Sequence, residues 1–403
     1  MNKRLQDIHA WIRQELTAAI VFWLKNGMDP EYGGVYTCLD REGQVFSTDK
    51  SVWMQGRCAW TFARLCNQYG ERPQWRNAAK SCLDFLEAHC INRDKGGRMY
   101  FTVTKDGRPL RQRRYNFSEG FYAMANAEYY ILTGQPQYLE RARTAYELIW
   151  NLNHGLIDDP VALGPKTIAS TRTGRALADP MIYLNLTSVL RRADPEQAQL
   201  YDQRAQQCVY DIFTYHRKKD MRCTLESVGP NGEFQSEFTA GRMVNPGHVI
   251  ECAWFVMEQA NYTGDTALHQ DAQDMFLDAI EDGWDKEYEG ILYFMDCLGK
   301  PPEAYEHDMK LWWPHNEAVI ASLMAYRDTG KQIYLDWFIK LVDYCKKVFS
   351  DPAYGEWYGY LRRDGQPTMP PCKGSTFKGP FHLPRMLMMV DDMLTALSER
   401  TVN

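Results

Sequence analysis

The sequence predicts an all-α fold, an (α/α)6 barrel of six helix pairs with short β-hairpins at one rim. Three observations support this prediction. A motif rich in turn residues and aromatics recurs about every 64 residues, amphipathic and apolar stretches of helical length alternate between its copies, and no Pro/Ser-rich linker divides the 403 residues. Such a period is typical of folds built from one repeated supersecondary unit. We therefore expect residues 1–403 to form a single barrel domain.

Each copy of the repeated motif begins with an aspartate. These aspartates are Asp29, Asp94, Asp220, Asp285 and Asp351. They lie 65 or 66 residues apart, except for one gap of 126 residues, in which we expect a degenerate sixth copy near residue 157. In each copy a turn precedes a short aromatic run, which an Asp-Gly or Asn-Gly turn follows in most copies. This order predicts a β-hairpin.

The segments between the motifs have helical periodicity. Trp53, Arg57, Trp60 and Arg64 recur at offsets of four, three and four, so they share one helix face. Amphipathic segments predict the outer helices, over 72–90, 136–151, 197–216, 265–281 and 331–349. More apolar segments predict the inner helices, over 53–69, 118–133, 180–191, 247–261 and 314–329. An open α-solenoid is the alternative, but a hairpin in every repeat would crowd one of its edges.

Composition and charge narrow the class of function. The net charge is −6, from 46 Lys and Arg against 52 Asp and Glu, which argues against a nucleic-acid partner. No apolar run approaches the ~18–20 residues that a membrane span needs, so we expect no membrane insertion. Residues 1–16 carry charges throughout and lack the apolar core of a signal peptide. We expect a cytoplasmic protein whose eleven cysteines stay reduced.

Polar residues recur at one phase of the repeat, where inner helices are predicted to start. Arg57 and His248 each follow a motif aspartate by 28 residues, and His315, His382 and Glu317 follow theirs by 30 to 32. Each of them alone has a structural interpretation, such as a helix-start histidine or a core ion pair. In a closed barrel, however, residues at one phase converge at one end of the central cavity.

Two chemistries fit this polar set, to which Glu251 belongs because it lies one helical turn after His248. Aromatics around the set could stack on sugar rings. The first chemistry is proton transfer at a sugar carbon, with histidines as acid and base and an arginine at the enediolate oxygen. The second is glycoside hydrolysis by two carboxylates. Histidine and arginine dominate the set, which favours the first. No HExxH, Walker A or dinucleotide motif occurs, and we predict no metal site.

Seven segments, spread almost from end to end, resemble the N-acylglucosamine 2-epimerase family, known in animals as renin-binding protein. They are FWLKNGMDPEYGGVYTCLDREG (22–43), VWMQGRCAW (52–60), FSEGFYAMA (117–125), RMVNPGHVIECAWF (242–255), MKLWWPHNEA (309–318), DPAYGEWYGYLRRDG (351–365) and FKGPFHLPR (377–385). The cellobiose 2-epimerases of the family usually carry Gln where His315 stands and a His near residues 180–186, where this chain has Met181. Both differences favour the amino-sugar branch.

The resemblance implies interconversion of N-acetylglucosamine and N-acetylmannosamine, in amino-sugar or sialic acid metabolism. His248 and His382 would be the two acid/base residues, and Arg57 would hold the enediolate oxygen. Glu317 and Glu251 would orient the histidines or assist ring opening. The sugar site would be lined by Trp53, Phe117, Lys310, Trp313 and His315, and by Asn185 from the degenerate fourth repeat.

The resemblance also implies a homodimer and ATP as an activator that is not consumed; no consumed cofactor is expected. The turn at residues 95–98 and the basic stretch 108–114 are candidate phosphate contacts, and a solvated basic loop is the alternative. Two other functions stay open from the sequence. One is a 2-epimerase or aldose–ketose isomerase for neutral sugars such as mannose or cellobiose. The other is a non-catalytic, protein-binding homologue.

Overall fold

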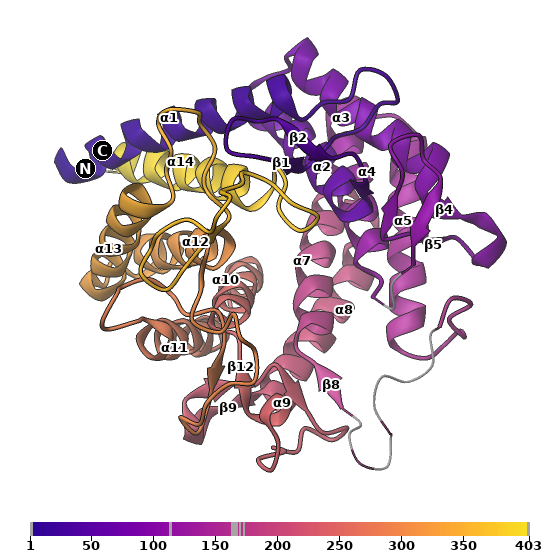
Figure 1. The fold of residues 1–403 in the computed structure, drawn as a ribbon. Helices are drawn as coiled ribbons and strands as arrows, with labels where there is room; N and C mark the ends of the chain where they lie inside the picture. The colour runs from indigo at the N-terminus through magenta and orange to yellow at the C-terminus, as the bar shows by residue number, and fades with distance from the viewer. Residues whose placement is uncertain (1–2, 113–114, 163–167, 169–170, 172–173, 401–403) are drawn as a thin grey trace.

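The computed structural model describes residues 3–112, 115–162, 168, 171 and 174–400. Inner helices form a ring around a central opening, and outer helices surround them (Figure 1). The inner helices are α2 (Val52–Tyr69), α4 (Phe117–Thr133), α7 (Ala178–Ala193), α10 (Pro246–Thr263), α12 (Trp312–Thr329) and α14 (His382–Arg400). Each packs against the next, and α14 closes the ring against α2. The predicted (α/α)6 barrel is confirmed.

Each inner helix has one outer partner. The outer helices are α3 (Pro73–Phe85), α5 (Pro136–Asn153), α8 (Ala198–Asp211), α11 (Thr266–Gly283), α13 (Gln332–Val348) and α1 (Lys3–Asn26). Helix α1 was not predicted from the sequence; it packs on α14 and so pairs the two ends of the chain. The ten predicted segments match helices to within two residues, except that 72–90 and 197–216 each end in a π turn, Leu86–Cys90 and Ile212–His216.

The inner helices are apolar on all sides because both faces are covered. On α12, every residue from Trp312 to Ala325 is buried. A helix that is hydrophobic all round belongs in a protein interior, whereas an amphipathic helix covers one face of a core. The start of α10 is capped by the Asn245 side chain, which accepts the His248 backbone N–H at 3.2 Å. This cap fixes where the helix begins and therefore where His248 lies.

Short strands connect successive repeats at the rim. Four of them end at the start of an inner helix or within two residues of it, namely β3 (Lys50–Ser51), β8 (Arg175–Ala176), β12 (Met243–Val244) and β14 (Lys310–Leu311). Each pairs antiparallel with a strand of the following motif, namely β6 (Thr102–Val103), β11 (Ser227–Val228), β13 (Met295–Asp296) and β15 (Tyr360–Leu361). The rim strands of neighbouring repeats lie side by side, which is why a strand of one repeat pairs with a strand of the next.

The predicted hairpins within single motifs are therefore only partly right. Local antiparallel pairs do form in β1 (Cys38–Leu39) with β2 (Val45–Ser47), β4 (Ile91–Asn92) with β5 (Arg98–Met99), β6 with β7 (Pro109–Arg111), and β9 (Arg217–Lys218) with β10 (Cys223–Thr224). The degenerate copy expected near residue 157 forms no strand within residues 154–162.

Buried lysine–aspartate pairs hold three motifs against the rim. Lys50 Nζ donates to Asp29 Oδ2 at 2.6 Å, and Lys310 Nζ donates to Asp285 Oδ2 at 2.9 Å. Lys373 Nζ lies 3.0 Å from Asp351 Oδ2 in the same way. Lys310 has 0% exposed surface, and its ammonium group is bonded to Asp285. Its predicted place in the lining of the sugar site is therefore wrong.

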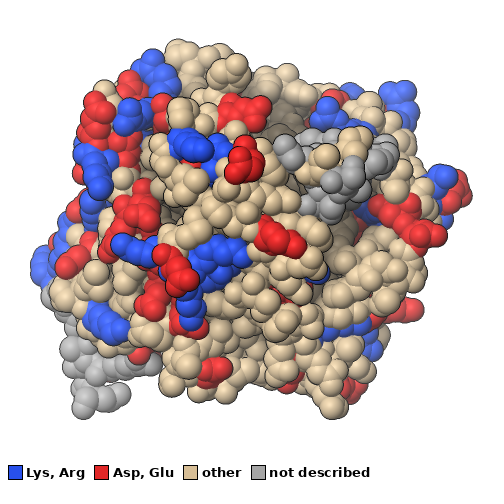
Figure 2. Space-filling model, turned by 90° about the horizontal axis from the view of Figure 1, so that it is seen from below, with Lys and Arg blue, Asp and Glu red and all other residues tan. Residues whose placement is uncertain are grey.

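Two further features bear on the predicted class of function: the apolar length of the helices and the distribution of surface charge. No helix in the described part of the chain is both long and apolar enough to cross a bilayer. On the face shown in Figure 2, acidic and basic side chains are intermingled and do not form one continuous basic patch.

We expect Lys50→Met to destabilise the fold, because it leaves the Asp29 carboxylate buried without its cation. Removing one partner of a buried pair costs roughly 3–5 kcal/mol, so the free energy of unfolding should fall by about that amount in urea denaturation at pH 7. The exposed Lys25→Met is the matched control and should change it by less than about 1 kcal/mol. Equal effects of the two variants would contradict the structural role of the pair.

The pH dependence of this difference has a defined sign. Burial raises the pKa of Asp29, but hydrogen bonds from Lys50, Tyr36 and two backbone amides outweigh it and leave that pKa lowered. A lowered folded-state pKa gives stability that is present above the unfolded value of about 3.9 and is lost as the pH falls. The gap between wild type and Lys50→Met should therefore shrink below about pH 4.

Candidate active site

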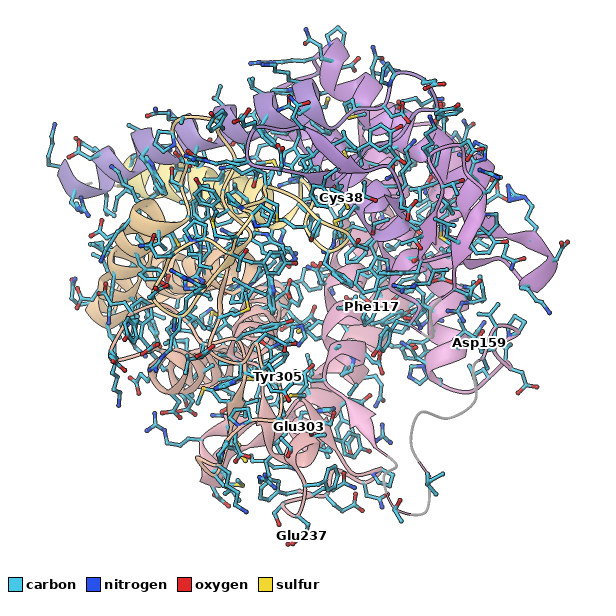
Figure 3. All side chains as sticks on the ribbon, viewed as in Figure 1. Cys38, Phe117, Asp159, Glu237, Glu303 and Tyr305 are labelled. Carbon is cyan, nitrogen blue, oxygen red and sulfur yellow. The ribbon has the colours of Figure 1, made fainter. Side chains whose placement is uncertain are left out.

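A cavity of about 530 Å³ opens at the rim end of the barrel, where the inner helices begin. All six inner helices contribute to its wall. Seven of the eleven predicted site residues line it, namely Trp53, Arg57, Phe117, His248, Glu251, Trp313 and His382. Figure 3 shows Phe117 at the edge of the central opening. The volume is that of a small-molecule site.

His382, the first residue of α14, is held by a buried carboxylate. Its Nδ1 lies 2.7 Å from Glu317 Oε1, and Glu317 is itself 0% exposed. A neutral imidazole that donates Nδ1–H to this carboxylate keeps Nε2 as its unprotonated nitrogen. Burial lowers the pKa of His382 well below its usual value, and the positive charges of Arg57 and Arg385 lower it further. His382 is thus neutral at physiological pH and can act as a base.

His248, in the first turn of α10, has the opposite electrostatic setting. Its Nδ1 lies 2.9 and 3.0 Å from the two carboxylate oxygens of Glu226. Burial lowers its pKa, but the charge and hydrogen bond of Glu226 outweigh burial and leave that pKa raised. His248 therefore favours the protonated form and can act as an acid.

Glu226 lies on the rim between β10 and β11 and is fixed by its backbone. Its N–H donates to the Met243 carbonyl at 3.0 Å, and its carbonyl accepts the Leu177 N–H at 2.9 Å. This residue was not predicted from the sequence, because it lies within the copy of the motif that begins with Asp220, away from the phase of the helix starts. The pairing of β11 with β8, which brings it to His248, is not visible in the sequence.

Arg57 projects into the cavity from α2 and forms no ion pair with any carboxylate of the described residues. Its guanidinium lies over the rings of Phe121 and Phe381, at 4.1 and 4.8 Å. Its buried Nε has no hydrogen-bond partner among the described residues. Burial lowers its pKa to about 9, so it stays charged at neutral pH. Such a cation is available to an oxyanion in the cavity.

Arg385 joins the buried carboxylates behind His382. Its Nη2 donates to Glu251 Oε1 at 2.6 Å and lies 2.7 Å from Glu317 Oε1. Ligand atoms of Glu251, Glu317 and His382 lie within 4.8 Å of one another, a spacing that could hold a metal ion. A cation there would have to displace the guanidinium, so the donor set fits an ion-pair network better than a metal site. Arg385 was not among the predicted site residues, although it lies one turn after His382.

Three other predicted residues do not reach this cavity, besides Lys310. His315 is 0% exposed; its Nδ1 donates to the Leu311 carbonyl at 2.6 Å and its Nε2 accepts the Ile291 N–H at 2.9 Å. Its predicted contact with substrate is wrong. Successive residues of a helix point about 100° apart around its axis, and His315 faces the Tyr344 ring of α13. Burial lowers its pKa to about 3. Glu317 lies behind His382, and Asn185 lines a second cavity, described below.

One wall of the active-site cavity is apolar. Ala178, Met181 and Ile182 of α7 line it together with Met309. Met181 is the residue that stands where the neutral-sugar relatives were expected to carry a polar side chain. The cavity therefore combines a charged floor with a side wall that suits a small alkyl group.

The chain matches the sequence profile of the family described as "N-acylglucosamine 2-epimerase (GlcNAc 2-epimerase)" over residues 34–378. The N-acylglucosamine 2-epimerase of Rattus norvegicus is 38% identical, over 99% of this chain and 96% of that protein. The cellobiose 2-epimerase of Bacteroides fragilis is 24% identical, over 93% and 96%.

A solved structure of cellobiose 2-epimerase from Bacillus thermoamylovorans B4167 superposes with a TM-score of 0.83 at 21% identity, covering 96% of this chain and 99% of that one. This likeness supports the barrel fold. The profile match covers most of the chain, and the rat relative matches almost all of it. The chain therefore belongs to the N-acylglucosamine 2-epimerase family.

Proposed function

We propose that the protein interconverts N-acetylglucosamine and N-acetylmannosamine by moving a proton at C2. The observation that carries this proposal is the pair of histidines on one cavity, one neutral and one favouring protonation, with Arg57 beside them. Such a pair supplies a base and an acid at the same pH. Family membership supports the reaction class.

The reaction proceeds from the open-chain aldose, whose C2–H is acidified by the C1 aldehyde. His382 Nε2 takes the C2 proton, and the C–H electron pair moves through C2–C1 onto O1. Arg57 stabilises the negative oxygen of this enediolate. His248 then returns a proton to C2 from the opposite face, and the electron pair on O1 re-forms the aldehyde. In the other direction the two histidines exchange roles.

The apolar wall supports an N-acyl sugar as substrate. An acetamido methyl packed against Met181 and Ile182 would leave water, which stabilises binding by about 0.8 kcal/mol per buried methyl-sized group. A neutral-sugar epimerase or isomerase is the second candidate, since the Bacteroides fragilis relative is a cellobiose 2-epimerase. The same two histidines would serve it, because an aldose–ketose isomerase differs only in reprotonating C1.

The remaining proposals are ATP as an unconsumed activator, a homodimer and a role in sialic acid metabolism, which rest on the resemblance alone, and a cytoplasmic location, which rests on the lack of a long apolar run in the sequence. We place no ATP site at the 95–98 turn. Arg98 is 1% exposed, and its guanidinium pairs with Glu119 at 2.7 Å and Asp159 at 2.5 Å. Of the basic stretch, Arg113 and Arg114 lie outside the described residues.

Proton NMR of the protein with N-acetylmannosamine in D2O tests the proposed activity. We expect N-acetylglucosamine to form with deuterium at C2, faster when ATP is present. Exchange at C2 of mannose or cellobiose, without reaction of N-acetylmannosamine, would favour the neutral-sugar candidate. If none of these sugars reacts, the proposal that the protein is an enzyme is contradicted and the protein-binding alternative remains.

The two histidines predict a bell-shaped pH profile of kcat/KM. Activity should fall on the acid side as His382 becomes protonated, below its ordinary pKa of about 6.5, and on the alkaline side as His248 loses its proton, above about 6.5. Glu226→Gln removes the charge that raises the His248 pKa, so its alkaline limb should move to lower pH. The exposed Glu237→Gln is a charge-matched control that should leave the profile unchanged. An unmoved alkaline limb in Glu226→Gln would refute the assignment of His248 as the acid.

A further inference from the structure

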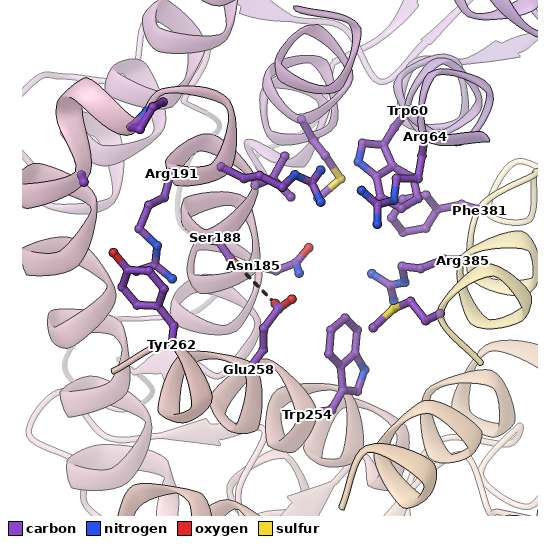
Figure 4. A pocket seen from close by; sticks show the side chains of 16 residues that line it. Trp60, Arg64, Asn185, Ser188, Arg191, Trp254, Glu258, Tyr262, Phe381 and Arg385 are labelled. Atoms are coloured by element: carbon purple, nitrogen blue, oxygen red, sulfur yellow. Dashed lines mark hydrogen bonds between the residues drawn. The ribbon is translucent and has the colours of Figure 1, made fainter. Parts of the chain in front are cut away.

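A second cavity of about 540 Å³ lies beyond the active-site cavity, toward the end of the barrel where the inner helices end. Its lining residues follow those of the active site by one or two turns along the same helices. Trp60 and Arg64 follow Trp53 and Arg57 on α2, and Asn185 follows Met181 on α7. We call it the distal cavity (Figure 4).

One wall of the distal cavity carries hydrogen-bond donors that have no acceptor in the described part of the chain. Trp60 Nε1 and Arg385 Nε are buried and have no partner among the described residues, and these side chains are 7% and 3% exposed. Arg64 Nη1 lies 3.7 Å from Glu128 Oε1, which is beyond hydrogen-bond distance. Figure 4 shows all three side chains on the same side of the cavity. Buried donors without acceptors are costly, so this wall fits a group that brings oxygen acceptors.

The charge near this wall points to an anion. Arg192, which also lines the cavity, and Arg64 both lie beside the buried carboxylate of Glu128. Two guanidiniums thus share one buried carboxylate. An oxyanion beside Arg64 would offset their repulsion and could accept two parallel N–H bonds from its guanidinium.

The opposite wall carries a different set of groups. Glu258 accepts a hydrogen bond from Ser188 at 3.2 Å, drawn as the dashed line in Figure 4, and Asn185 lies beside them. A carboxylate and an amide are good partners for sugar hydroxyls. Trp254 and Tyr262 add flat aromatic surfaces that suit a sugar ring.

We propose that the distal cavity binds an anionic monosaccharide, a sugar phosphate or a sugar acid, and that its occupation changes the rate of epimerisation. The anion would bind Trp60, Arg64 and Arg385, and the hydroxyls would face Asn185 and Glu258. The route to the active site is short. Arg385 also binds Glu251 and Glu317, and Glu317 holds His382. The rate effect rests on the proposed function, whereas the binding does not.

Isothermal titration calorimetry tests the binding. N-acetylglucosamine 6-phosphate and D-glucuronate are titrated separately into protein saturated with N-acetylmannosamine, so that the active-site cavity is filled. We expect at least one probe to bind, and Arg64→Gln to weaken it about tenfold or more, since a hydrogen bond to a charged group contributes ~1.5–3 kcal/mol. The exposed Arg362→Gln is the matched control and should bind like wild type.

The outcomes separate the alternatives. The probe that binds identifies phosphate or carboxylate as the anion. If neither probe binds at 10 mM, a concentration about tenfold above a Kd of 1 mM, the proposal is overturned. So would binding that Arg64→Gln leaves unchanged, or inorganic phosphate binding as tightly as the sugar phosphate. Should Arg64→Gln fail to fold, Glu258→Gln gives a second variant, with an expected loss of about threefold or more.

The rate effect is measured on the same samples, as kcat at saturating N-acetylmannosamine with and without the bound probe. We expect a change of about twofold or more, with the change absent in Arg64→Gln. Binding without any change in kcat would overturn the coupling to His382. A protein that binds the probe but epimerises no sugar would instead contradict the proposed function.

Discussion

The fully buried carboxylate of Glu317 is the interaction on which the active-site geometry depends. It belongs to α12, accepts Trp254 Nε1–H of α10 at 2.8 Å, and contacts His382 Nδ1 and Arg385 Nη2 of α14 at 2.7 Å each. An ionised carboxylate in a protein interior is costly unless it is paired and hydrogen-bonded. The three inner helices therefore pack correctly only with these donors in place, and the same bonds set the tautomer of His382.

The two histidines differ because the barrel gives each a different set of neighbours. His382 lies among two guanidiniums and is buried, so its charged form is disfavoured although a carboxylate touches it. His248 has Glu226 on its Nδ1, and its protonated form is favoured. Helix α14 supplies one histidine, and a cap and a rim strand position the other. The fold thus separates the pKa values of two identical side chains, which is what acid–base chemistry on two faces of one carbon requires.

Much of the fold followed from the sequence because its signals are local. Helical periodicity located the ten helix segments, and the spacing of the motif aspartates predicted the ring. The failures come from effects that are not local. Lys310 was predicted from the family resemblance and His315 from its repeat phase, but a buried aspartate holds the first and the second turns toward an outer helix. Asn185 lies one helical turn after Met181 on α7 and therefore lines the distal cavity instead of the active-site cavity. Glu226 reaches His248 only through strand pairing between repeats.

The most direct test of the two-histidine account is C2 hydrogen exchange in D2O by His248→Gln and His382→Gln, measured separately from pure N-acetylglucosamine and pure N-acetylmannosamine. The account predicts that each variant loses interconversion by a hundredfold or more, as expected for removal of a general acid or base, yet retains exchange from one epimer, a different one for each variant. The remaining histidine can still remove and return a proton on its own face. Exchange from the same epimer in both variants, or interconversion at near wild-type rate in either, would contradict it.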